Sequence, residues 1–461
     1  MAMMPYTSTL QTNFFAGVAA GKPMECTGLP SGVKPPEPCV EAHSQVVLWS
    51  TWTSFFTNSV LAVYLNPAFG TWSDLHGRKG FIVLGMMMEC LPFIAILLYL
   101  KDILPLYWYY PAHIIASSVS AYTVALGYLG DVISRENRTV VFGFWAGTFN
   151  VSSIIGSSIN ISGLVRTPEV AAVVALGTVV ISTALAAVWL PESLPPAARL
   201  AARQRAYEAG VLGGRGLMAC VKKPFLSAWT SLKILARNEL FMKLTVTVTI
   251  FFIVLQETME FIFQYLQEVA GFDTMDQSIF FAVLGVGGLF TLYVVLWFLF
   301  TVVGLSEKSV LIIGIISFAL EQLMLSLVHA KWQGYAAIAV GSLGGLAFPA
   351  IQAIKSKSVG EEEQGAVQGA LVGARSVGQG IGPFFFLILF NGFRSRGLYF
   401  PAAPFVAALV LELGALVVAS TIRLPSEFLG VQKHAREKKA MRAGGLLDED
   451  QEKTPLLQDN V

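Results

Sequence analysis

Runs of mostly apolar residues, each long enough to form a membrane helix, recur along most of the chain and are separated by short polar segments. A helix needs about 20 such residues to cross the hydrocarbon core of a bilayer. The pattern predicts eleven spans, at residues 46–70, 81–100, 108–129, 140–164, 170–190, 244–266, 278–303, 310–328, 332–354, 365–390 and 399–420. Five spans come before a polar gap at 191–243 and six come after it. We therefore expect an all-α integral membrane protein.

Composition supports a chain that faces lipid over most of its surface. Hydrophobic residues make up 54% of the 461 residues, whereas Asp, Glu, Lys and Arg together make up 13%. Soluble domains carry about 25% charged residues, so this chain has too little charge to cover a soluble surface. The formal net charge of +1 gives no reason to expect nucleic acid as a partner. The composition excludes soluble enzymes, disordered chains and secreted disulfide scaffolds, and the lipid bilayer is the expected surrounding.

The distribution of Lys and Arg among the loops predicts which side of the membrane each loop faces. The central gap is strongly basic, and Arg78, Lys79, Asp131 and Arg138 lie at the rim on the same side. Loops rich in Lys and Arg stay in the cytoplasm, so this side is predicted to be cytoplasmic. With eleven spans, residues 1–45 then lie on the opposite side, yet they contain no cleavable signal sequence. A first helix missing upstream would explain this, and a genuine eleven-span protein is the alternative.

Two stretches of the chain repeat at an offset of 226 residues, which matches the distance between the two groups of spans. At this offset Gly143 falls on Gly369 and Gly147 on Gly373, at the junction of a loop with a helix. Repeated halves are typical of secondary transporters, whose binding site lies between the repeats. The predicted organisation is a non-cytoplasmic segment at 1–45, an N-terminal half-bundle at 46–190, a central loop at 191–243, a C-terminal half-bundle at 244–421 and a disordered cytoplasmic tail at 422–461.

The loop between the first two spans contains the motif Gly70-Thr-Trp-Ser-Asp74-Leu-His-Gly77-Arg78-Lys79. It resembles the signature loop of the major facilitator superfamily, in which Gly, Asp, Gly and Arg recur at these spacings. Leu75 departs from the family, which has a basic residue at that position. The resemblance implies close packing of two helices at the glycines and a pair between Asp74 and Arg78 at the cytoplasmic rim. An ordinary charged loop is the alternative.

Further stretches resemble one branch of this superfamily, the tetracycline-exporter-like and hippocampus-abundant-transcript-like proteins. They lie at residues 190–196, 255–257, 264–268, 348–349, 365–375 and 382–383. The resemblance implies a major facilitator fold of two six-helix half-bundles around a cavity, from which this chain lacks the first helix. Antiporters of the family carry Gly-Pro in helix 5, where this chain has Gly156-Ser157. This departure puts drug–proton antiport in doubt.

Ionisable residues within the spans are the candidates for binding and coupling, because charge inside a membrane is unfavourable without a partner or a function. The family's fold places Glu257 and Arg375 in the cavity-lining helices 7 and 11, with Glu260 on the same helical face as Glu257. These groups are predicted either to exchange partners during proton-coupled transport or to form a permanent ion pair. The same fold places three further residues in peripheral helices, away from the cavity: Glu89, Glu321 and Glu412.

Cys26 and Cys39 lie in the segment predicted to be non-cytoplasmic, where disulfides form. Their separation would close a small loop over the mouth of the cavity. Both interpretations stay open at this point, a disulfide and two free thiols.

The C-terminal tail is basic at first and then acidic, which is typical of a disordered cytosolic segment. It contains Glu452-Lys-Thr-Pro-Leu456-Leu457, which resembles an acidic dileucine sorting signal for endosomal or vacuolar membranes. Location in the plasma membrane is the alternative.

Together these patterns predict a secondary active transporter that moves a small organic solute by alternating access, with protons as the candidate coupling ion. The alternative is a non-transporting receptor or assembly factor that reuses the same fold. The sequence contains no phosphate-binding loop, no nucleophile with an associated base and no grouping of metal ligands. We therefore expect neither an enzyme nor a metal site nor a cofactor, and we expect a monomer.

Overall fold

The computed structural model describes residues 1–28, 35–62, 65, 69, 72–73, 75–133, 138–197, 199–200, 203–204, 239–357, 364–395 and 400–423. These residues form helices joined by turns, with no strand among them. Seven helices in this part of the chain are long and apolar enough to cross a membrane. The all-α membrane architecture expected from the sequence is therefore confirmed, whereas the count of eleven spans and the missing first helix stay predictions.

The N-terminal half comprises the helices before the central loop. They are α1 (Met4–Ala20), α2 (Glu37–Ser54) with the π-helical turn η1 (Phe55–Leu61), α4 (Arg78–Met88), α5 (Cys90–Leu100), the short η2 (Leu106–Trp108), α6 (Tyr109–Ala116), α7 (Ala121–Val132), α8 (Arg138–Ile161) and α9 (Pro168–Trp189). Helix α9 begins after Thr167, whose hydroxyl oxygen accepts a hydrogen bond from the Val170 N–H. Such a cap satisfies one of the free N–H groups at a helix start.

The C-terminal half comprises the helices after the central loop. They are α12 (Glu239–Ala270), α13 (Thr274–Leu289) with the π-helical turns η3 (Phe290–Val295) and η4 (Phe298–Val303), α14 (Glu307–Ser326), α15 (Lys331–Gly341), η5 (Ser342–Leu346), α16 (Ala347–Lys357), α17 (Gln364–Ser395) and α18 (Ala403–Ser420). A large apolar core holds these helices together, with Phe261 and Phe405 fully buried in it. The buried Tyr265 hydroxyl donates to the Leu325 carbonyl oxygen at 2.7 Å.

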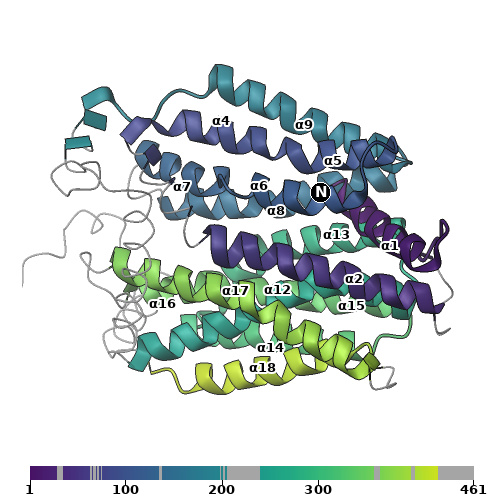
Figure 1. Ribbon diagram of the computed structural model, residues 1–461. Coiled ribbons are helices and arrows are strands. Elements are labelled where there is room, and N and C mark those ends of the chain that lie inside the picture. The colour runs from purple at the N-terminus through teal and green to yellow at the C-terminus, as the bar shows by residue number, and fades with distance from the viewer. Residues whose placement is uncertain are drawn as a thin grey trace, which may run out of the picture.

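Figure 1 shows the helices running side by side, with α4, α5 and α9 along one edge of the molecule and α14 and α18 along the opposite edge. The two halves meet where α8 packs along α13 and where α2 and η1 pack along α17. The first contact is close, because a Cβ on Gly285 of α13 would come within 2.8 Å of the Asn150 carbonyl oxygen of α8. Each predicted window coincides with helix over most of its described length.

The structure differs from the sequence analysis within residues 1–45, where it places the helix α1 inside the bundle. This helix packs against α2 and also contacts α13, α9 and α12. Its buried residues include Ser8, Gln11 and Thr12, so polar side chains face neighbouring helices. A search for long apolar windows overlooks such a helix, because its polar positions serve contacts within the protein and interrupt the apolar run.

Two of the predicted spans in the N-terminal half, 81–100 and 108–129, are each broken into two helices, and the two breaks are close in space. Helix α4 gives way to α5 at Glu89, where Pro92 has no N–H to continue the hydrogen-bond pattern. Helix α6 gives way to α7 across residues 117–120, where serine hydroxyls compete for backbone groups. The two breaks lie side by side, because a Cβ on Gly85 would come within 2.7 Å of the Val119 carbonyl oxygen. Only glycine permits this approach.

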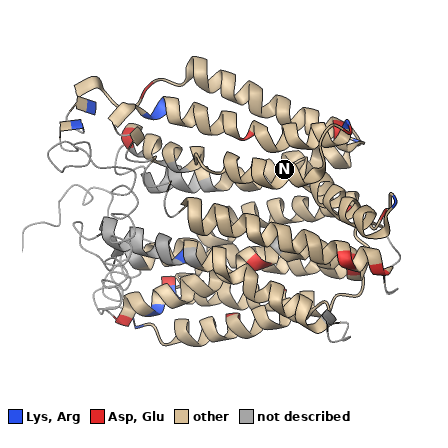
Figure 2. Cartoon of the chain, in the orientation of Figure 1, with Lys and Arg blue, Asp and Glu red and all other residues tan. Residues whose placement is uncertain are grey.

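Charged residues gather at the two ends of the helices, with few in the helix bodies (Figure 2). At one end α4 begins and α9 ends, and this end carries Arg78 and Lys243. At the other end α5 finishes and α9 begins, and Lys101 pairs there with Glu169 at 3.0 Å. We call the first the cytoplasmic end, following the sequence prediction, and the second the outer end.

Candidate functional site

A polar cavity of about 520 Å³ opens between helices of the N-terminal half and reaches α12 of the C-terminal half. Sites for small molecules commonly measure about 300–1,000 Å³. Hydroxyl, amide and tyrosine side chains dominate its walls. The lining residues are Gln11, Ser50, Thr53, Ser54, Thr57, Asn58, Ala62, Glu89, Tyr109, Tyr110, His113, Ser117, Ser120, Ala121, Tyr122 and Gln256. The cavity can therefore offer many hydrogen bonds to a polar solute.

A chain of hydrogen bonds crosses from the C-terminal half to the N-terminal half beside this cavity. Arg375 Nε donates to Gln379 Oε1 at 3.0 Å, and Gln379 Nε2 donates to Gln256 Oε1 at 3.3 Å. Gln256 Nε2 then donates to Ser54 Oγ at 3.3 Å, which also accepts from Asn58 Nδ2 at 3.0 Å. We call these five residues the inter-half chain. Because they come from α17, α12, α2 and η1, relative movement of the halves must break this chain.

Arg375 is held by contacts other than an acidic partner. Its guanidinium carbon lies 3.9 Å from the centre of the Phe252 ring, a cation–π contact. Tyr122 of the N-terminal half is near enough to interact with it electrostatically. In the described part of the chain no carboxylate forms an ion pair with Arg375. A positive charge therefore lies at the interface between the two halves, which we call the seam.

The expected pairing of Glu257 with Arg375 is not formed. Glu257 is fully buried and accepts a hydrogen bond from the Thr258 hydroxyl at 3.4 Å, and Thr258 in turn contacts Gln322 of α14. It therefore points into the C-terminal half, and its neighbour Gln256 faces the cavity. Successive residues of a helix differ by about 100° in direction, so a shift of one position decides which side chain reaches the seam. The Glu260 side chain lies outside what the structure describes.

The three acidic residues predicted to be peripheral have two different locations. Glu321 and Glu412 are fully buried in the C-terminal half and do not line the cavity, and Glu321 interacts electrostatically with Glu257. Glu89 does line the cavity, against expectation. Glu89 lies at the break between α4 and α5, beside the break between α6 and α7, whose Ser117 and Ser120 also line the cavity.

The signature loop contributes to a second polar cluster, at the cytoplasmic end. Arg78 pairs with Asp131 at the end of α7, and Ser193 Oγ donates to the same carboxylate at 2.9 Å. The Glu192 carboxylate accepts from the Arg78 and Lys79 N–H groups at 2.8 Å and 3.3 Å. A carboxylate at the start of α4 is stabilised by the positive end of the helix dipole. We call Arg78, Asp131, Glu192 and Ser193 the rim cluster.

Gly77 is required for this geometry. Its φ of +106° belongs to a region that side chains disfavour, and a Cβ there would collide with the Glu192 carboxylate. The sequence analysis noted residues 190–196 as a resemblance without assigning a role to Glu192 or Ser193. Gly70, Asp74 and the Arg138 side chain lie outside what the structure describes.

A buried polar network joins the halves at the outer end. His43 of α2 lies 2.7 Å from Gln264 Oε1 of α12, and the Thr12 hydroxyl of α1 is 3.1 Å from the same oxygen. Thr12 also contacts Gln267 Oε1 at 3.0 Å, and both glutamines donate to Ser8 Oγ. We call these five residues the outer network. This network was not predicted from the sequence, because no long apolar window covers α1.

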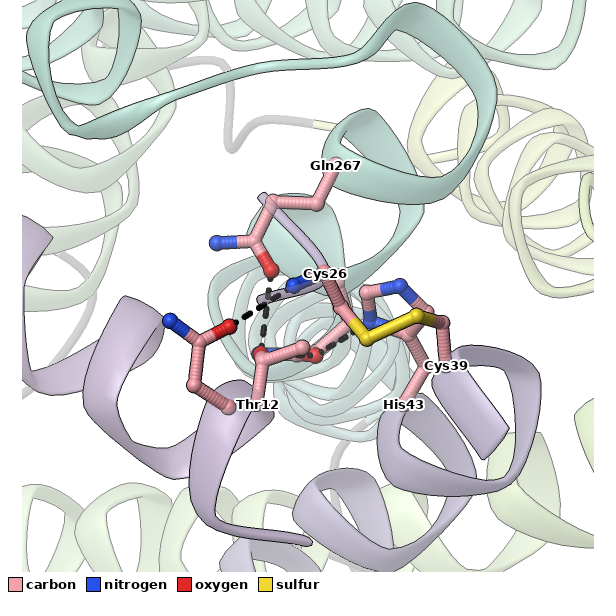
Figure 3. Close-up of a disulfide and its surroundings, with 7 residues drawn as sticks. Thr12, Cys26, Cys39, His43 and Gln267 are labelled. Carbon is pink, nitrogen blue, oxygen red and sulfur yellow. Dashed lines mark hydrogen bonds between the residues drawn. A yellow bond between two sulfur atoms is a disulfide. The ribbon is translucent and has the colours of Figure 1, made fainter. Parts of the chain in front are cut away.

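Cys26 and Cys39 form a disulfide beside this network (Figure 3). Cys39 lies in the first turn of α2, and the Cys26 N–H donates to Asn13 Oδ1 of α1 at 2.9 Å. The disulfide thus connects the segment after α1 with the start of α2. The two helices that carry Thr12 and His43 are held together by a covalent bond at the outer end.

Two helical halves that meet along two seams, with a polar cavity beside hydrogen bonds that bridge them, have the architecture of secondary transporters. The sequence model of the Major Facilitator Superfamily matches residues 44–383, and the chain belongs to this superfamily of transporters. The family expected from the signature loop is therefore confirmed.

Relatives of known name agree with the branch suggested by the sequence. The chain is 28% identical over 333 residues to "Hippocampus abundant transcript 1 protein" of Mus musculus, covering 71% of this chain and 63% of that protein. It is 27% identical over 424 residues to human "Hippocampus abundant transcript-like protein 1", covering 86% and 77%. A shorter stretch of 87 residues, 19% of this chain and 22% of the relative, is 33% identical to "Tetracycline resistance protein, class D" of Salmonella ordonez. The resemblance to this branch is confirmed.

Solved structures share the fold at low sequence identity. The human organic anion transporter MFSD10 (TETRAN) superposes with a TM-score of 0.57 at 14% identity, covering 90% of both chains. A variant of the nucleoside transporter NupG superposes with a TM-score of 0.59 at 12% identity, covering 91% of this chain and 97% of that one. At such identities the likeness concerns the fold alone.

Proposed function

We propose that this protein is a secondary active transporter that carries a small polar organic solute by alternating access. The observation that supports this most is the position of the inter-half chain, which runs from Arg375 to Asn58 beside the polar cavity. A solute bound at Gln256 or Ser54 would replace hydrogen bonds that otherwise tie the halves together. Binding would thereby change the balance between conformations, which is how a ligand acts on a two-state carrier.

The same geometry suggests how access alternates. The outer network joins α1 and α2 to α12 at the outer end, and we infer that it forms the outer gate in this conformation. Opening outwards requires Gln264 and Gln267 of α12 to leave Thr12 and His43. Rocking of one half against the other provides this movement in transporters with repeated halves. In this conformation Glu257 bonds to Thr258 and Arg375 to Gln379, so the exchange of partners predicted for these two groups would require them to meet in another conformation.

A transport measurement on Gln379→Leu tests the proposal. We expect the initial rate of solute uptake to fall about ten-fold or more, because the substitution removes the contacts through which Arg375 reaches the cavity, and hydrogen bonds to charged groups contribute about 1.5–3 kcal/mol. The full-length protein is reconstituted in sealed vesicles with an imposed pH gradient, and uptake of a mixture of organic solutes is followed by mass spectrometry.

Gln45→Leu is the matched control, because Gln45 lies on α2 outside the cavity lining. Wild-type rates in Gln379→Leu would remove the inter-half chain from the mechanism. Vesicles that take up none of the solutes, with or without the gradient, would favour the alternative of a non-transporting receptor or assembly factor.

We further propose that the tail directs the protein to endosomal or vacuolar membranes. Residues 422–461 include Glu452, Leu456 and Leu457, and all three lie outside the described residues. Replacing Leu456 and Leu457 with alanine is expected to move a tagged protein to the cell surface, because the substitution removes both leucines of the proposed signal. Fluorescence microscopy with surface biotinylation measures the shift. The pair at residues 446–447 (Leu-Leu) is the matched control, and an unchanged distribution would reject the signal.

A further inference from the structure

Glu89 is the acidic group of the cavity, and nothing in the protein neutralises it within the described residues. It sits at the turn between α4 and α5, lines the cavity, and is exposed there. Its carboxylate forms no ion pair with any described Lys or Arg. Carboxylates within membrane helices are unfavourable unless water, a partner or a ligand meets them. The group is therefore available to a ligand.

The charges around the cavity favour a positive group at this point. Among the described lining residues there is no Lys or Arg, and Glu89 and His113 are the titratable groups apart from the tyrosines. Arg375 is not a lining residue: its guanidinium bonds to Gln379 and lies over the Phe252 ring, and it interacts electrostatically with Tyr122 of the lining. A described lining with one carboxylate and no cation favours positively charged solutes.

Aromatic rings and hydroxyl groups complete a site of this kind. Tyr109, Tyr110 and Tyr122 line the cavity together with Glu89, and ring faces attract ammonium groups through their quadrupole. Ser117 and Ser120 flank the break between α6 and α7, opposite the break that carries Glu89. Interrupted membrane helices commonly surround the substrate of a transporter, since they bring polar backbone and side chains to mid-membrane.

A metal ion fits this arrangement less well than an organic cation. The described residues contain no group of three His, Cys, Asp or Glu side chains close enough to share an ion. Small hard cations require several oxygen ligands at short distance, whereas an amine is satisfied by one carboxylate and ring faces.

We propose that the cavity binds a solute with a positively charged amine. The amine forms an ion pair with Glu89, and the rest of the solute forms hydrogen bonds with the hydroxyl and amide groups of the walls. This inference deepens the proposed function and rests on it, because it assigns the substrate class of the same cavity. Glu89 is on this account a binding residue that determines charge preference.

The test compares matched probes of equal shape on the purified full chain in nanodiscs. Choline is paired with its neutral carbon isostere dimethylbutanol, and phenethylamine is paired with phenethyl alcohol. Binding is measured by microscale thermophoresis and by ligand-induced thermal stabilisation. We expect at least one amine to bind about ten-fold or more tightly than its neutral counterpart, as one charge-assisted contact provides. Glu89→Gln is expected to abolish this preference and leave binding of the neutral probe unchanged.

Glu412→Gln is the matched control, because Glu412 is fully buried in the C-terminal half and does not line the cavity. If Glu89→Gln fails to fold, Glu89→Asp keeps the charge but withdraws it by one methylene, and a weakened but retained preference is expected. Equal binding of amines and alcohols, no binding of either amine, or an unchanged preference in a folded Glu89→Gln would each overturn the inference.

The two proposals fail separately. If amine binding depends on Glu89 but the protein takes up no solute in vesicles, the amine site is supported and the transport function is contradicted. Uptake of anionic or neutral solutes at a rate that Glu89→Gln does not change would support the transport function and contradict the proposal of an amine substrate.

Discussion

Arg78→Ala is expected to lower the initial transport rate about ten-fold or more while the amount of protein in the membrane stays normal. Arg78 pairs with Asp131 across the start of α4 and the end of α7, and the rim cluster extends through Ser193 and Glu192 to the chain that follows α9. Contacts of this kind at the end of a half-bundle bias one conformation over another. Coupled equilibria typically respond by about 1–3 kcal/mol, which corresponds to about 5–150-fold in rate when the disfavoured step limits transport.

The controls for this prediction separate charge from geometry. Lys79→Ala removes the adjacent positive charge but keeps the N–H that binds Glu192, so near-normal transport is expected. Arg78→Lys keeps the positive charge but lacks the planar guanidinium group that can donate two hydrogen bonds to a carboxylate. An intermediate rate is therefore expected. Rates are measured in vesicles after normalising to the protein amount on immunoblots. Wild-type rates in Arg78→Ala would show that the rim cluster plays no part in the transport cycle.

Loss of the disulfide is expected to have the largest effect on stability. Cys26 and Cys39 are 13 residues apart in sequence, and closing a loop of about 15 residues is expected to stabilise a fold by about 3 kcal/mol through restriction of the unfolded chain. Cys39→Ser should therefore lower the apparent unfolding midpoint of the purified protein by several degrees. Wild-type protein treated with a reductant should show the same decrease, measured by intrinsic tryptophan fluorescence on heating.

Cys90→Ser provides the comparison for this prediction, because Cys90 is a free thiol in the described part of the chain and its loss should leave the midpoint unchanged. The disulfide holds α1 and α2 where Thr12 and His43 meet Gln264, so reduction should also loosen the outer network. Faster hydrogen exchange in residues 4–20 would report this. A midpoint unaffected by both Cys39→Ser and the reductant would rule out a stabilising disulfide.

The candidate site was only partly predictable from sequence, because a sequence reveals which residues are unusual in a membrane but not where they point. Arg375 was expected to line the cavity; it is not a lining residue, and it connects through Gln379 to Gln256, which is one. Glu257 was expected beside it, yet the rotation of α12 directs Gln256 to the seam and Glu257 into the C-terminal half. Glu89 was assigned to the periphery because its helix is peripheral in the family. In the structure Glu89 lies at the break between α4 and α5, beside the break between α6 and α7, and lines the cavity.

The sequence by itself determined the features that depend on composition and local pattern. Long apolar windows define helices because hydrocarbon requires every backbone group to be paired within the segment. The motif from Gly77 to Lys79 identifies the family because a turn and a charge pair need those residue types. Tertiary structure alone decided the features that depend on which side chains meet across helices. Helix α1, with Ser8 and Thr12 buried against α12, is such a feature, because polar residues that would be unfavourable in lipid are stable where a distant segment supplies their hydrogen-bond partners.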